Sequence, residues 1–163
     1  MQWTDESIAF LRDAPAMNRY YETIAEKIAP QLPENAHVCD AGCGIGELRL
    51  ALQPYCRRVT AVDADALAIK TLKAHLIEGV IAICGDVEAL TPKEPYDAMV
   101  FSLFGRTEDT LRIARKQCRR KIFLVKRDYS HHRFSAGKVS LGEYTAGSTE
   151  NVLREKGVVP VHH

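Results

Sequence analysis

The stretch Val38-Cys39-Asp40-Ala41-Gly42-Cys43-Gly44-Ile45-Gly46-Glu47-Leu48 decides the fold of this chain. It starts as a short apolar run, passes through three alternating glycines and ends where a helical pattern begins, so it predicts a strand, a tight loop and a helix. Because glycine has no β-carbon, the backbone can turn sharply there and a ligand can lie directly against the loop. A turn with a purely structural role would need only one or two glycines.

Outward from this junction, short apolar runs alternate with helix-like stretches. We expect strands over 37–41, 58–62, 80–84, 96–102, 121–126 and 158–162, and helical stretches beginning near Glu47, Asp65, Asp86, Thr107 and Thr149. Asp65 is the expected N-cap of its helix. This pattern predicts an α/β fold: a doubly wound, mostly parallel sheet with helices on both faces, which binds ligands beyond the carboxyl ends of its strands.

The first 34 residues predict a helical lead-in to this sheet. Residues 15–32 carry apolar side chains at the spacing of one helical face, and we expect Pro33 to end that helix. A shorter helical pattern follows Asp5. Tyr20 and Tyr21 lie on the apolar face of this segment, where core packing is favoured over ligand contact; Trp3 is another of its aromatic residues.

Composition limits the classes of function. The chain has 163 residues, a formal charge of +1 and 46% hydrophobic residues, which predicts one globular domain over 1–163 and no global affinity for nucleic acid or anionic membranes. We expect no secretory signal and no membrane span, and therefore a cytoplasmic protein. The five cysteines are odd in number and lack a paired C-x-x-C framework, so we expect neither a disulfide scaffold nor a metal site.

The glycine spacing separates two cofactor classes. The dinucleotide-binding fingerprint is G-x-G-x-x-G, whereas here the third glycine comes one position early and Glu47 stands where that fingerprint has glycine. The pattern D-x-G-x-G-x-G instead resembles the motif of class I, Rossmann-like S-adenosylmethionine-dependent methyltransferases. The resemblance implies S-adenosyl-L-methionine as cofactor, held by Asp40, Ala41, Gly42, Cys43, Gly44 and Gly46.

Three further matches follow in the family's order. Asp63, with Ala64 beside it, ends the second strand 17 positions after Gly46, where a carboxylate can accept hydrogen bonds from both ribose hydroxyls. The resemblance implies adenine contacts at Asp86 and Val87, although Asp86 could equally be only a helix cap. Ser102 ends the fourth strand and should line the pocket with the residues up to Gly105, whereas Asp97 at that strand's start is predicted to be structural.

The sequence leaves the methyl acceptor open. The chain lacks the Asn-Pro-Pro-Tyr or Asp-Pro-Pro-Tyr sequence that family members acting on nucleobase or glutamine amino groups often carry, and we expect a small-molecule acceptor. No catalytic residue is assigned. Candidates for a base are Asp128, Tyr129, His131 and His132. A non-catalytic S-adenosylmethionine-binding module or accessory subunit is the alternative, and the oligomeric state is not determined.

A basic segment over 112–133 has two interpretations. It contains Arg112, Arg115, Lys116, Arg119, Arg120, Lys121, Lys126, Arg127 and Arg133. A solvated outer helix face is favoured, and a surface for RNA or another anionic substrate is the alternative. The family usually completes its sheet with a seventh, antiparallel strand, so we expect either a truncated member or a fragment, with His162 and His163 native or left from a tag.

Overall fold

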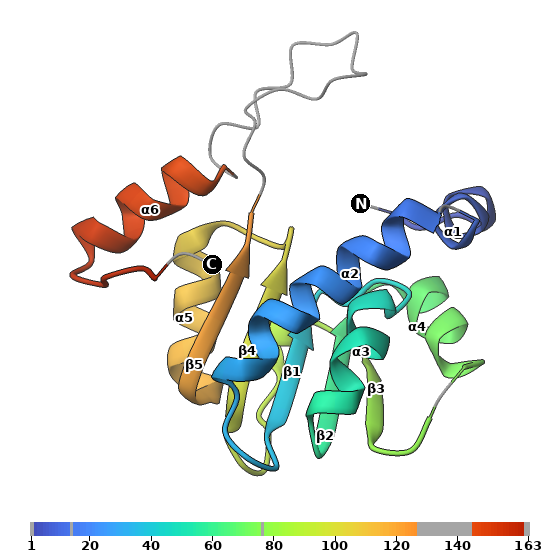
Figure 1. Cartoon of the computed structure of the whole chain (residues 1–163), viewed down its shortest axis with the longest axis horizontal. Coiled ribbons are helices and arrows are strands. Elements are labelled where there is room, and N and C mark those ends of the chain that lie inside the picture. The colour runs from blue at the N-terminus through green and yellow to red at the C-terminus, as the bar shows by residue number, and fades with distance from the viewer. Residues whose placement is uncertain (1, 14, 76, 127–144, 162–163) are drawn as a thin grey trace, which may run out of the picture.

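A computed structural model of the chain describes residues 2–13, 15–75, 77–126 and 145–161. Within these residues five parallel strands form one sheet (Figure 1). Their order across the sheet is β3 (Val80–Cys84), β2 (Arg58–Asp63), β1 (His37–Ala41), β4 (Tyr96–Ser102) and β5 (Cys118–Val125). The strand order reverses direction between β1 and β4, which confirms the predicted doubly wound α/β fold and places the ligand crevice at the carboxyl ends of these two strands.

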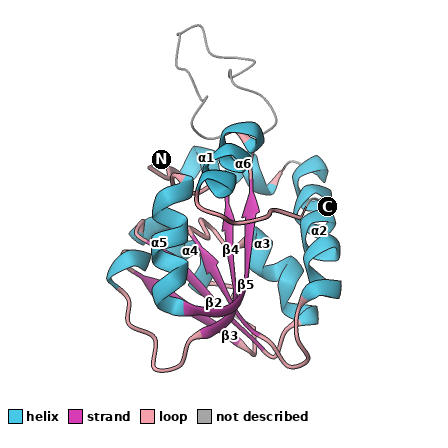
Figure 2. Ribbon diagram, turned by 90° about the vertical axis from the view of Figure 1, so that its left-hand side faces the viewer, coloured by secondary structure: helices cyan, strands magenta, loops and turns pink. Residues whose placement is uncertain are grey.

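Helices cover both faces of the sheet. Figure 2 shows the strands between α5 on one side and α2 with α3 on the other. The α-helices are α1 (Asp5–Arg12), α2 (Pro15–Ile28), α3 (Glu47–Leu52), α4 (Ala66–Lys73), α5 (Thr107–Gln117) and α6 (Ala146–Glu155), and the 3-10 helices are η1 (Ala29–Gln31), η2 (Gln53–Tyr55) and η3 (Val87–Ala89).

The core has two layers because neighbouring strand residues point to opposite faces. Val38 and Val100 belong to the layer that packs under α2 and α3, while Cys39 and Met99 belong to the layer under α5. The central strands β1 and β4 are thus buried on both sides. A rigid centre of this kind fixes the positions of the loops that follow each strand.

The predicted sixth strand over 158–162 is wrong for the residues the structure describes. Gly157 (φ +71°) ends α6, and the amide of Val158 donates back to the Leu153 carbonyl at 2.8 Å. Residues 158–161 lie outside any strand, with Val159 86% exposed. The valines have high strand propensity, but Pro160 lacks an amide donor, and propensity without a neighbouring strand forms no ladder. Residue 162 lies outside the described residues.

Several element boundaries also differ from prediction. The helical stretch expected near Asp86 is only η3, because Pro92 and Pro95 follow closely and disfavour helical backbone before them. Helix α2 ends at Ile28 rather than near Pro33, since Pro30 already lacks the amide that a longer helix would need. Strand β5 starts three residues before Lys121, and α6 three residues before Thr149.

Candidate functional site

The glycine loop joins β1 to α3 through left-handed backbone. Gly42, Gly44 and Gly46 have φ values of +73°, +54° and +90°, a region that residues with a β-carbon rarely adopt. The amides of Gly42 and Cys43 both donate to the carbonyl of Val62, at 2.8 and 3.0 Å. The loop is therefore held against the carboxyl end of β2, and all three glycines are needed for its shape.

The Asp63 carboxylate lies against this loop. Its Oδ2 accepts a hydrogen bond from the Gly44 amide at 2.8 Å, and its Oδ1 accepts one from the Asp65 amide at 2.9 Å. Each carboxylate oxygen has two lone pairs, so each can accept one further hydrogen bond. The structure thus brings Asp63 and the glycine loop together, with acceptor capacity that suits a pair of vicinal hydroxyls. The neighbouring Ala64 is exposed.

Asp40 is buried beneath the loop with an unsatisfied oxygen. The residue is 1% exposed, and its Oδ2 has no hydrogen-bond partner among the described residues. Burial, and then the charge of Asp63, raises the pKa of Asp40 to about 7, against a lowering by Arg49. An unpaired buried acceptor is costly. Together with the glycine cradle, this acceptor fits a cofactor that carries a hydrogen-bond donor.

Arg49 is a feature of the site that sequence reasoning missed. It is 1% exposed, its Nη2 donates to the His75 carbonyl at 3.2 Å, and its other guanidinium nitrogens lack a partner among the described residues. Its Nε lies 3.0 Å from the position a β-carbon on Gly46 would take. The signal was an arginine within the apolar run Leu48–Leu52, which places a cation on the buried face of a short helix.

Two aromatic rings cover the glycines. A β-carbon on Gly42 would lie 2.2 Å from the Phe104 ring, and one on Gly44 would lie 2.6 Å from the Trp3 indole. Such distances exclude a side chain at either glycine without movement of the ring. Phe104 also stacks on Phe101, with ring centroids 6.1 Å apart. The faces of the loop left free by the missing β-carbons are thus occupied by the chain's own aromatic side chains.

The loop after β4 is strained and tied to β5. Leu103 has φ +52°, which is unfavourable for a residue with a β-carbon, and its amide donates to the Val125 carbonyl at 3.0 Å. The Lys126 ammonium donates to the carbonyls of Phe104 and Gly105 at 3.3 and 2.9 Å. Burial lowers the pKa of Lys126. Lys126, a member of the basic segment, therefore holds the strand end where the half-buried Ser102 lies.

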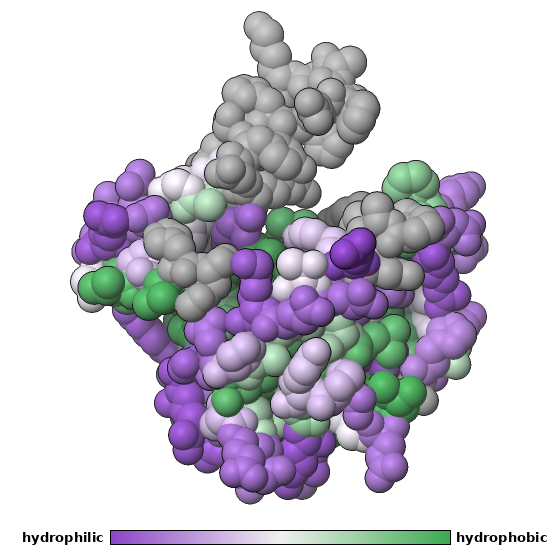
Figure 3. Space-filling view, in the orientation of Figure 1, coloured by the Kyte–Doolittle hydropathy of each residue, from purple (hydrophilic) through white to green (hydrophobic). Residues whose placement is uncertain are grey.

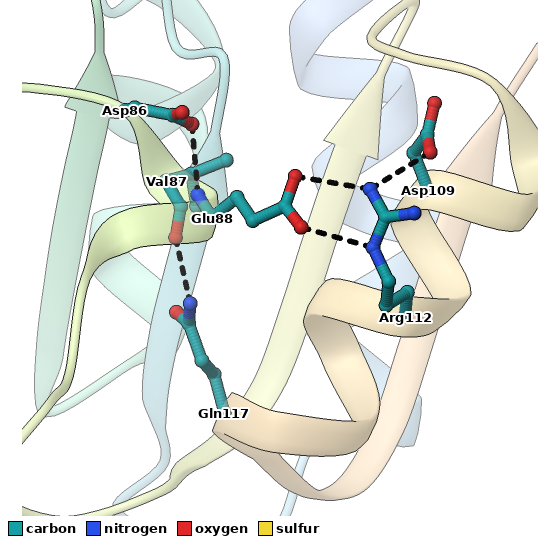
Figure 4. A network of polar contacts seen from close by, with 6 residues as sticks. All are labelled: Asp86, Val87, Glu88, Asp109, Arg112 and Gln117. Atoms are coloured by element: carbon teal, nitrogen blue, oxygen red, sulfur yellow. Dashed lines mark hydrogen bonds and ion pairs between the residues drawn. The ribbon is translucent and has the colours of Figure 1, made fainter.

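The end of β3 joins the same edge of the sheet. The Gly85 amide donates to the Asp63 carbonyl at 2.9 Å. Asp86 is exposed and caps η3, because its Oδ1 accepts from the Glu88 amide at 2.9 Å, as Figure 4 shows. Val87 is buried, and its carbonyl accepts from Gln117 Nε2 at 2.6 Å. The capping function of Asp86 is confirmed, whereas its contact with adenine stays a prediction.

Several arginines of the basic segment pair with carboxylates. Arg112 contacts Glu88 and Asp109, each at 2.9 Å (Figure 4). Arg119 contacts Asp97 at 2.8 Å, and Arg120 lies 3.5 Å from the same carboxylate oxygen. Asp97 stands at the amino end of β4, away from the glycine loop, which agrees with a structural function. The base candidates Asp128, Tyr129, His131 and His132 lie outside the described residues, as do Arg127 and Arg133.

A shallow groove of about 330 Å³ between α2 and α3 is separate from the loop. Its lining includes Glu22 and Glu26, which would repel anionic ligands. On the face formed by α2 and α3, Figure 3 shows hydrophilic and hydrophobic residues interspersed. In the described part of the chain, no group of three or more His, Cys, Asp or Glu side chains could hold a metal ion. Among the same residues, none of the helices combines the length and the apolar composition of a membrane span.

Comparisons with known proteins give one matching family and several similar structures. A family model described as a methyltransferase domain matches residues 38–122, slightly more than half of the chain. Coclaurine N-methyltransferase, solved with N-methylheliamine and SAH, aligns with a TM-score of 0.65 over 88% of this chain and 50% of its own, at 18% identity. The YcgJ protein of Bacillus subtilis aligns with a TM-score of 0.57 over 67% of this chain and 51% of its own, at 20% identity.

An amino pentose methyltransferase from Micromonospora echinaspora, solved with bound SAM, aligns with a TM-score of 0.52 over 70% of this chain and 50% of its own, at 18% identity. At such identities these structures show a shared fold. The chain spans about half the length of each of these three proteins. No curated protein matches the sequence significantly.

Proposed function

Because the chain belongs to the methyltransferase-domain family, we propose that it transfers the methyl group of S-adenosylmethionine to a small-molecule acceptor. S-adenosylmethionine is the cofactor of this family. The observation that carries the proposal is the contact between the Gly44 amide and the Asp63 carboxylate at 2.8 Å, which joins the glycine loop to an acid at the switch point of the sheet.

We assign the cofactor to the carboxyl edge of the sheet. The proposed contacts are Asp40, Ala41, Gly42, Cys43, Gly44, Gly46, Asp63, Ala64, Asp86, Val87 and Ser102. The free lone pairs of Asp63 would accept the ribose hydroxyls, and the unpaired oxygen of Asp40 would accept a donor that approaches through the loop. Asp86 would continue to cap η3 while it contacts adenine.

The sulfonium of the bound cofactor supplies an electrophilic methyl group, so the protein's main task is to position a nucleophile in line with it. The strained loop after β4 is suited to that task, because Lys126 and Val125 hold its backbone in one conformation. A fixed wall beside the reacting centre restricts the approach of the acceptor.

A small-molecule acceptor is favoured over RNA by the charge arrangement. Arg112, Arg119 and Arg120 already have carboxylate partners, and an arginine must give up such a partner before it can neutralise a phosphate. The pairs at Asp97 also lie at the amino end of the sheet, opposite the glycine loop.

Calorimetric titration with S-adenosylhomocysteine, with NADH as the control ligand, tests the cofactor without knowledge of the acceptor. We expect about one equivalent of S-adenosylhomocysteine to bind, and NADH to fail to compete. We expect Asp63→Ala to weaken the binding free energy by roughly 1.5–3 kcal/mol, the contribution of hydrogen bonds to a charged group, and this result would support the ribose assignment. Normal binding by Asp63→Ala would contradict it.

Turnover tests the acceptor. The protein is incubated with S-adenosylmethionine and a panel of small amines, phenols and carboxylates, with total RNA as a separate arm, and the S-adenosylhomocysteine formed is measured. Turnover with a small molecule alone would support the proposal. Turnover with RNA alone would favour the alternative substrate, and cofactor binding without turnover across the panel would favour a non-catalytic module.

A further inference from the structure

Trp3 lies directly on the central glycine of the loop. Three indole atoms, Cζ2, Cε2 and Cη2, lie 2.6, 3.3 and 3.4 Å from the position a β-carbon on Gly44 would occupy. The indole therefore fills the space that the absent side chain leaves open. Gly44 is buried in consequence, although its loop stands at the ligand-binding edge of the sheet.

This position of Trp3 is anchored by main-chain and apolar contacts. The Trp3 amide donates to Asp65 Oδ2 at 3.0 Å, and the following residue, Thr4, begins α1 with a capping box that includes Ser7. Trp3 and Ile8 belong to one apolar cluster with Ile45, the loop residue after Gly44. Such a set of contacts holds the indole in place while no ligand competes for it.

The anchor of Trp3 is also part of the cofactor site. Asp65 accepts from Trp3 through Oδ2, while its own amide donates to Asp63, which in turn accepts from Gly44. Hydrogen bonds therefore connect the Trp3 amide to the Asp63 carboxylate, which we assign to the ribose, and the Trp3 indole itself packs against Gly44. Movement at one member of this ring of contacts affects the others.

We propose that Trp3 is a gate of the cofactor site, whose indole covers Gly44 in the free protein and is displaced when the adenosyl group binds. The inference rests on the proposed function, since it requires the glycine loop to bind this cofactor. Because the covered state cannot bind, the apparent affinity is reduced by the fraction of molecules in which the gate is open. Removal of the indole should raise that affinity.

The affinity test compares the intact chain with Trp3→Ala, Trp3→Phe and the control Phe10→Ala. Phe10 is on α1, 75% exposed, and outside the cluster around Ile45. We expect Trp3→Ala to bind S-adenosylhomocysteine at least about threefold more tightly, as for a gate closed in most free molecules. Trp3→Phe should be intermediate and Phe10→Ala unchanged. Thermal unfolding of each variant establishes that it is folded, and Trp3→Phe keeps the test usable should Trp3→Ala unfold.

A fluorescence titration follows the indole itself. Trp3 is the single tryptophan of the chain, so emission excited selectively at the indole reports this contact without a contribution from another tryptophan. We expect a red shift as S-adenosylhomocysteine binds, because the half-buried ring moves into water. Equal or weaker binding by both folded Trp3 variants, or an emission that stays unchanged or shifts to the blue at saturation, would overturn the gate while leaving the proposed function intact. Absence of binding in all four proteins would overturn the proposed function and the gate with it.

Discussion

Asp40 and Asp97 lie on the neighbouring central strands β1 and β4, and both are almost fully buried, yet their surroundings differ. Asp97 accepts from the His37 amide at 2.9 Å and from Arg119 at 2.8 Å. Burial alone would raise its pKa, but these hydrogen bonds and charges outweigh it, and the pKa of Asp97 is lowered. Asp40 keeps an oxygen without a partner among the described residues, and burial raises its pKa to about 7.

The difference follows the direction of the strands. The amino end of the sheet is completed by the protein's own groups, so its carboxylate stabilises the fold. The carboxyl end contains three glycines, which lose more backbone freedom on folding than other residues, together with a strained Leu103 and an unpaired acceptor, and each of these costs stability. Such destabilising features are concentrated where a ligand is expected to bind, and four substitutions test that interpretation.

The largest effect is expected for Gly44→Val at the carboxyl end. A valine would have to adopt φ +54° and overlap the Trp3 indole, so S-adenosylhomocysteine binding should fall below calorimetric detection, with a stability loss on the order of 2 kcal/mol. Gly147→Ala is the matched control, because beyond its chain neighbours and the local helix backbone no atom lies within 4 Å of its added β-carbon. Binding retained by folded Gly44→Val would show that the cofactor does not approach this glycine.

Asp40→Asn should change how stability depends on pH. A pKa raised from 3.8 to about 7 means that the unfolded chain releases this proton first, so the carboxyl's contribution to stability is fully present below about pH 4 and is lost by about pH 7. Urea unfolding of the natural protein should therefore lose on the order of 2–4 kcal/mol more than Asp40→Asn across this window. Parallel pH curves for the two proteins would contradict a raised pKa.

Asp97→Asn should change the pH dependence of stability in the opposite direction. Because the pKa of Asp97 is lowered, its stabilisation is present above the pKa of the unfolded chain and is lost as the pH falls through the folded value. With Arg119 about half exposed, we expect a loss of about 1–2 kcal/mol at pH 7 that disappears in acid. S-adenosylhomocysteine affinity should stay within about twofold, and a large fall in affinity would link the two ends of the sheet.

Arg112→Gln should have the smallest effect, and it shows how much a surface ion pair contributes to stability. The side chains of Arg112, Glu88 and Asp109 are all partly exposed to water, so urea unfolding should show only a small loss of stability that diminishes at high salt. Turnover with a small-molecule acceptor should be unchanged. A selective loss of RNA binding or RNA methylation in this variant would revive the alternative interpretation of the basic segment.

Prediction succeeded where a short apolar run pairs with a neighbouring strand of the sheet. Three of the expected strands, 37–41, 80–84 and 96–102, have the observed bounds, and Asp65 caps α4 as expected. It failed for 158–162, where strand propensity met no pairing partner in the described residues, and near Asp86, where prolines shortened the helix. The first failure could not be avoided from local pattern, since pairing depends on what else reaches that edge of the sheet, whereas the prolines after Asp86 were a local signal that the helix would be short.

The sequence by itself determined the glycine loop, the acid 17 positions after it and the parallel sheet around them, because glycine spacing and apolar periodicity are local properties. Only the tertiary structure decided that Trp3 covers Gly44, that Phe104 covers Gly42, and that Arg49 and an unpaired oxygen of Asp40 lie buried near the loop. These contacts join residues far apart in the chain, and their existence depends on how helices pack against the sheet, which no single stretch of sequence encodes.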